Sequence, residues 1–117
     1  MKKLNAAICK KLNELLPGVP VYPVIADEDA SLPYMVYTDS SFTVERTKDG
    51  PYGQIHDVSV QIWTEQFDQG DEMADTVQDG LVYVIAPGIE SLLMSGNSGY
   101  QGDAFYQTLN FEIEIDV

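Results

Sequence analysis

Hydrophobic residues recur along the chain with two different periods, and each period predicts one kind of element. Near the N-terminus, Leu4, Ile8 and Leu12 lie four residues apart, with lysines and asparagines mostly between them. This spacing predicts an amphipathic helix of about 14 residues. Pro17-Gly18 follows and is expected to end the helix, because this pair favours a turn.

A second helical pattern begins at Asp68 or Gly70. Acidic residues in its first turn suit the positive end of the helix dipole. The Pro87-Gly88 pair marks its expected end. Its apolar stripe consists of Met73, Val77, Leu81 and Val84.

Alternation with period two, together with β-branched and aromatic residues, predicts the remaining segments as strands. The clearest case is the last segment, where apolar and polar residues alternate strictly from Leu109 to Asp116. Pro20 and Pro23 remove backbone donors from the first segment, so it is expected at an edge of the sheet. The expected strands span residues 19–25, 34–45, 55–65, 91–95 and 105–117, with polar loops at 46–53 and 96–102. Segment 34–45 is expected as one long strand or as two strands broken at 39–41.

These elements run in the order α-β-β-β-α-β-β within one expected domain, residues 1–117. Consecutive strands joined by short turns favour antiparallel pairing. Each helix has a single apolar stripe that must be buried against the sheet. The sequence therefore predicts an α+β fold, a two-layer sandwich in which two helices cover one face of an antiparallel sheet of about four to five strands.

Charge is distributed unevenly along this acidic protein. Its formal net charge is −13, all six basic residues lie within residues 1–48, and residues 49–117 carry thirteen acidic residues. Such a surface repels nucleic acid, because binding there depends on cations that neutralise phosphates. Two explanations of this acidity involve no specific function: it keeps the protein soluble, or the host's proteins are acidic in general. Two others are functional: the acidic residues line a channel, or they mimic DNA.

The sequence gives no sign of a membrane protein or a secreted one. No apolar run approaches the roughly 18 residues that a membrane helix needs. The stretch after Met1-Lys2-Lys3 is too polar for a signal peptide, so a location in the cytoplasm is expected. The single cysteine, Cys9, cannot form an internal disulfide and is interpreted as a structural thiol.

Residues with catalytic or ligand-binding chemistry are sparse. His56 is the one histidine, and no serine lies in a nucleophile elbow. The acidic turn at 27–29 lacks the glycine and the distal glutamate of a calcium loop. The glycines of segment 96–102 are not followed by a lysine, so we interpret them as part of a hairpin rather than a phosphate site. We expect no enzyme activity, no metal ligands and no cofactor.

Trp63 does not fit the alternation of its own strand. Val58, Val60 and Ile62 share one face of the strand, and Trp63 falls on the other. If the valines meet the helices, Trp63 points away from the core and marks a contact with another chain. A bulge or twist that returns Trp63 to the core is the alternative.

Parts of the sequence resemble the small tail-completion, or tail-terminator, proteins of long-tailed phages and prophages. Residues 30–37 (ASLPYMVY) are similar to the hydrophobic-Pro-Tyr-x-Val opening of a strand in that family. The turn at 47–50, the strand 57–63 that ends in Trp63 and the helix 71–81 follow in the family's order and spacing. Gly80 departs from the alanine-rich pattern of the family's helix.

The resemblance implies a structural role in virion assembly. Proteins of this family cap the head-proximal end of the tail tube, often as a hexameric ring, and help join the tail to the head. The implied partners are further copies of the chain, the tail tube and the head–tail connector proteins. The protein is then expected in the cytoplasm of the host bacterium and afterwards in the virion tail.

The candidate functional residues form two groups. Glu112, Glu114 and Asp116 share one face of the last strand, about 6.6 Å apart in succession, as a solvated face or as the lining of a lumen through which DNA slides. The candidate subunit contacts are Tyr52, Trp63, Phe67, Arg46 and Lys48.

Two other functions stay open. The acidity beyond residue 48 fits a binding module that mimics DNA and occupies a basic groove on a protein partner. A small enzyme centred on His56 is the other, and it predicts a deep pocket with convergent polar groups.

Overall fold

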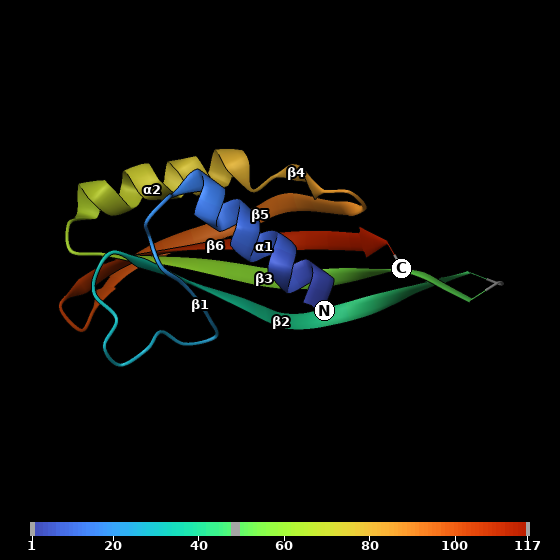
Figure 1. Ribbon diagram of the computed structural model, residues 1–117, viewed down its shortest axis with the longest axis horizontal. Coiled ribbons are helices and arrows are strands. Elements are labelled where there is room, and N and C mark those ends of the chain that lie inside the picture. Colours follow the sequence, from blue (N-terminus) through green and yellow to red (C-terminus); the bar gives the residue numbers. More distant parts are fainter. Residues whose placement is uncertain (1, 48–49, 117) are drawn as a thin grey trace.

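The computed structural model describes residues 2–47 and 50–116. Within them, one six-stranded sheet carries both helices on the same face (Figure 1). The elements are α1 (Lys2–Leu15), β1 (Val21–Pro23), β2 (Tyr34–Thr47), β3 (Gly50–Thr64), α2 (Phe67–Gly80), β4 (Tyr83–Ala86), β5 (Ile89–Gln101) and β6 (Ala104–Asp116).

The predicted fold, an antiparallel sheet of about four to five strands, is wrong. The strands are ordered β1-β2-β3-β6-β5-β4, and the sheet is mixed because β1 pairs with β2 in parallel. A hairpin of two residues suffices for antiparallel pairing, whereas a parallel pair needs a connection of about a dozen. Segment 24–33, between β1 and β2, is long enough to bring the chain back to the same end of the sheet.

The strand that the sequence did not predict is β4. The second helix ends at Gly80 rather than at Pro87, and its apolar stripe stops at the buried Leu81. Tyr83 has a positive φ of 61°, a left-handed conformation that a right-handed helix does not contain. Val84 therefore belongs to an exposed edge strand, although its spacing continues the helical stripe.

The predicted loops at 46–53 and 96–102 are also largely strand. β2 and β3 form a long hairpin, and β5 runs on to Gln101 opposite β6. Gly99 has a specific role there, because a Cβ atom at this position would overlap the ring of Tyr106 on β6. Glycine in this strand thus marks a close approach of an aromatic ring rather than a loop.

The core lies between the helices and one face of the sheet. Alternate residues of β3 and β6 point to this inner face, as their strict patterns predict. The buried residues include Leu4, Ile8 and Leu12 of α1, Met35 and Tyr37 of β2, Val58, Val60 and Ile62 of β3, Met73, Ala74 and Val77 of α2, Leu81, Ile89 of β5, and Leu109, Phe111, Ile113 and Ile115 of β6.

Gly80 lets the two helices approach each other. A Cβ atom at this position would overlap the side chain of Leu15, which packs against the C-terminal end of α2. The space for Leu15 explains why glycine, a poor helix former, stands here in place of the alanine that the family resemblance predicts.

Candidate functional site

The outer face of the sheet, turned away from both helices, carries a row of aromatic side chains. Trp63 lies there in register with Tyr34 of β2 and Tyr106 of β6. Its ring centroid is 6.4 Å from that of Tyr34 and 5.0 Å from that of Tyr106. Tyr22 of β1 meets Tyr34 edge-on at 5.9 Å. We call these four residues the aromatic row; it crosses four neighbouring strands.

Trp63 therefore points away from the core. The register between β3 and β6 is unbroken from Gly53 to Thr64, so no bulge in this pairing turns Trp63 inward. Its side chain is only half-exposed, because the neighbouring tyrosines cover it on both sides. Contacts within the chain therefore already bury part of the indole ring, and only the remainder is open to another chain.

The other predicted contact residues do not gather around Trp63. Phe67 is half-exposed at the start of α2, where it packs edge-on against Phe105. Arg46 is exposed near the far end of the β2–β3 hairpin, roughly 40 Å along β3 from Trp63. Lys48 lies outside the described residues, and Tyr52 is described only as a backbone position in β3.

The predicted acidic residues lie together on the outer face near the end of β6. Glu114 pairs in register with Glu90 of β5, and Asp116 lies beyond it on the same strand. The pKa of Glu114 is raised, chiefly by the charge of Glu45 on β2, with Glu90 and Asp116 adding to the effect. The rise shows that like charges crowd this part of the surface.

Replacing Glu114 with glutamine is expected to raise the melting temperature at about pH 7 and leave it unchanged at about pH 4. The raised pKa means that the folded protein holds this proton more tightly than the unfolded chain, whose value is near 4.5. The stability contributed by such a group is fully present below the unfolded pKa and is lost as pH rises through the folded pKa. Glutamine carries no charge, so the variant escapes that loss.

Thermal unfolding followed by circular dichroism measures this difference. Glu65→Gln is the matched control, because Glu65 is exposed in the turn after β3 and away from the cluster. An equal gain in both variants would mean that the total charge of the protein, rather than the crowding at Glu114, limits its stability.

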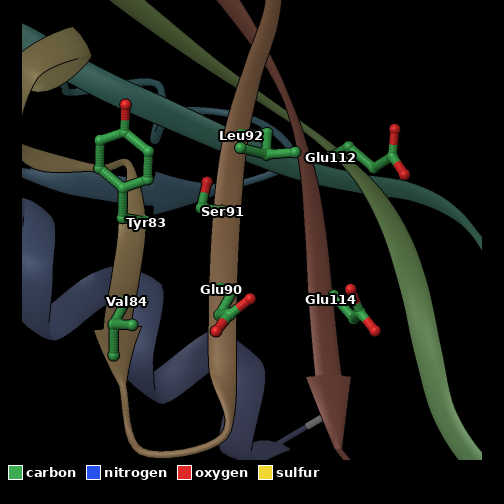
Figure 2. A pocket seen from close by; sticks show the side chains of 7 residues that line it. All are labelled: Tyr83, Val84, Glu90, Ser91, Leu92, Glu112 and Glu114. Atoms are coloured by element: carbon green, nitrogen blue, oxygen red, sulfur yellow. The ribbon is translucent and has the colours of Figure 1, made fainter.

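Beside these carboxylates, β4, β5 and β6 form a groove of about 270 Å³ on the outer face. Figure 2 shows the carboxylates of Glu90 and Glu114 on neighbouring strands, with Val84 beside Glu90 on β4 and Leu92 further along β5. Carboxylates beside apolar walls suit a lysine or arginine, whose stem is apolar and whose head is charged. The groove is lined by Tyr83, Val84, Glu90, Ser91, Leu92, Glu112 and Glu114.

His56 lies on the inner face and is 1% exposed. Its Nδ1 atom is 2.7 Å from Oδ2 of Asp39, and its Nε2 atom is 2.9 Å from Oε1 of Gln54. The ring of Phe42 stacks on the imidazole at 5.2 Å. Polar groups do converge on His56, but the imidazole is buried and both nitrogens already have partners, an arrangement that holds strands together.

The part of the chain that the structure describes contains neither a metal-binding cluster nor a helix fit to cross a membrane. Within residues 2–47 and 50–116, no group of three or more His, Cys, Asp or Glu side chains is arranged to hold a metal ion. In the same part of the chain, no helix has both the length and the apolar character needed to cross a membrane. Cys9 is a free, half-buried thiol on α1.

The fold has a counterpart among solved structures. The chain is similar to a chain of the structure described as "Virion of native gene transfer agent (GTA) particle", with a TM-score of 0.75 and 19% sequence identity. The match covers 97% of this chain and 95% of that chain. No family model matches the sequence, and no curated protein matches it. At this identity the likeness establishes a shared fold.

Sequence reasoning missed several residues of these surfaces. The sequence could have placed Tyr106 on the outer face. It lies an even number of residues from Glu112 in the same strand, so both side chains are on one face of the sheet. No such signal existed for Tyr83 and Val84, because their strand was assigned to a helix. The groove is therefore a feature that only the structure reveals.

Proposed function

We propose that this chain is a structural subunit of a phage-like virion, encoded by a phage or a prophage. It caps the tail tube and helps join the tail to the head connector, and it works as a ring of identical copies. The observation that carries the proposal is the likeness, over nearly the whole of both chains, to a chain of a gene transfer agent virion. The motifs at residues 30–37 and 57–63 resemble those of tail-completion proteins, and this resemblance supports the more specific role in completing the tail.

The surfaces of the chain support a binding role rather than catalysis. A ring subunit needs faces for its neighbours, and the outer face carries the aromatic row and the groove without a helix above them. His56, the residue on which the enzyme hypothesis depends, is buried beneath Phe42. We therefore propose that the chain has no catalytic activity.

Inactivating the gene in its host and inducing particle production tests this role. We expect separate heads and tails in electron micrographs, and a plasmid copy of the gene is expected to restore joined particles. Mass spectrometry of the restored particles is expected to detect the chain. Joined particles of normal yield in the absence of the chain would overturn the proposal.

The same experiment separates the proposal from the DNA-mimic alternative. An acidic decoy would leave particle structure intact when it is lost. It would also capture a basic protein in a salt-sensitive manner, because exposed charges are screened as ionic strength rises.

A further inference from the structure

The charge asymmetry of the sequence becomes two surfaces of opposite sign in the fold. The exposed side of α1 carries Lys3, Ala6, Lys10 and Asn13, which share one side of the helix. The groove carries three glutamates, at positions 90, 112 and 114, on neighbouring strands. These surfaces are the most clearly complementary pair that the described residues offer.

The groove is also more apolar than a free protein surface favours. The exposed fractions of Tyr83, Val84 and Leu92 are 72%, 63% and 55%. Large apolar side chains grouped in this way mark sites of contact with another molecule. An occupant must therefore cover apolar surface and neutralise carboxylates together.

The two surfaces lie on opposite faces of the same strands. In Figure 2, α1 passes behind β4 and β5, on the side away from the groove. Near the turn between these strands, a side chain at Gly88 would come within 4.0 Å of the amino nitrogen of Lys3. The same position would lie 3.7 Å from Oδ2 of Asp116, so the amino group of Lys3 lies on the helix side near the acidic end of β6. Lys3 and Lys10 are both exposed.

We propose that the groove binds α1 of a second copy of this chain, with Lys3 and Lys10 beside the glutamates of the groove. This inference rests on the proposed function, because it names the contact between neighbours in the ring. Lys3 and Lys10 are about 10 Å apart along the helix axis. Glu112 and Glu114 are about 7 Å apart along β6, so the two charged sets are of similar extent.

The contact has a direction. The helix layer of one copy meets the outer face of the next, so the two sides of the contact are different surfaces. A contact of this kind repeats from copy to copy and gives a ring when the rotation closes. The acidic exposed side of α2, with Asp71, Asp75 and Asp79, is repelled by the groove, so charge selects α1 as the occupant.

The neighbouring charge also explains why the free groove is strained electrostatically. The pKa of Glu114 is raised because Glu45, Glu90 and Asp116 surround it. A lysine from another copy relieves this repulsion, so assembly is expected to weaken with added salt.

Charge reversal tests the contact, with sedimentation velocity as the readout. The helix variant is Lys3→Glu with Lys10→Glu, and the groove variant is Glu90→Lys with Glu112→Lys. We expect the wild-type protein to assemble, each variant alone to sediment as a monomer, and an equal mixture of the two to assemble again with alternating copies. In that mixture, each of the two pairings between different variants joins unlike charges, whereas each pairing between copies of the same variant joins like charges.

A chain that carries both sets of substitutions keeps the net charge of −13 and is expected to assemble as the wild type does. The matched control for the groove variant is Glu72→Lys with Asp75→Lys, on the exposed side of α2. This control is expected to assemble normally. Circular dichroism confirms that each variant is folded.

Two outcomes overturn the inference and leave the proposed function standing. One is a groove variant that still assembles, which would place the ring contact elsewhere. The other is a wild-type chain that stays monomeric at every concentration tested while the gene remains necessary for joining heads to tails. Joined particles without the chain would instead remove the proposed function, whatever the sedimentation shows.

Discussion

Replacing His56 with alanine is expected to lower the free energy of unfolding by about 3 to 5 kcal/mol. The imidazole is 1% exposed and Asp39 is 10% exposed, so the substitution leaves a buried carboxylate without its nearest partner. Within the described residues, Oδ1 of Asp39 already lacks a hydrogen bond. The space beneath Phe42 adds the cost of a cavity. Urea unfolding followed by circular dichroism measures the loss.

A double-mutant cycle shows whether the loss belongs to the pair. Asp39→Ala with His56→Ala is expected to cost less than the sum of the single variants, by about 1 to 3 kcal/mol, because no partner is then left unpaired. Additive losses would contradict the coupling between these side chains. His56→Ala with a loss below about 1 kcal/mol would show that the interior of the sheet does not depend on this network.

Replacing Trp63 with alanine is expected to lower the free energy of unfolding of the monomer by about 2 to 3 kcal/mol. The ring packs between Tyr34 and Tyr106, and both contacts are lost with it. Phenylalanine keeps an aromatic ring in the row, so Trp63→Phe is expected to cost less than half as much. Trp63 is the one tryptophan, so unfolding is followed by circular dichroism rather than by fluorescence.

Measuring both the stability and the assembly of the Trp63 variants also shows whether the aromatic row stabilises the monomer or binds another chain. A loss of monomer stability means that Trp63 braces strands within the chain. An unchanged monomer that no longer assembles would contradict this view and make Trp63 a contact residue, as the sequence pattern alone predicted.

Hydrophobic periodicity predicted an element well where one side of that helix or strand is buried along its whole length. The apolar side of α1 and the alternation in β6 are both strong signals, and the structure has a helix and a strand there. The pattern was misleading at Val84. Its spacing of seven residues from Val77 matches the period of a helix, but a single match of this kind also arises by chance. The positive φ of Tyr83 decides between the two, and no sequence pattern encodes it.

The pattern of hydrophobic residues within a segment does not show which strands, distant in the sequence, pair with each other. The sequence predicted consecutive pairing, yet β3 pairs with β6 across α2, β4 and β5. The Asp39–His56 pair joins β2 to β3 beside a register shift between Asp39 and Ser41, and the spacing within one strand does not reveal a contact between two strands. Parity within one strand placed Trp63 and Glu112 on the outer face, because that property needs no knowledge of neighbours.

The position of β6 has a consequence for how the protein is made. β6 leaves the ribosome after both β3 and β5, yet it lies between them in the sheet. Until it arrives, β3 and β5 both present unpaired edges, so the nascent chain cannot complete its sheet. Tyr106 of the aromatic row and Glu112 and Glu114 of the groove all belong to this strand. A chain that stops before β6 therefore lacks part of each surface.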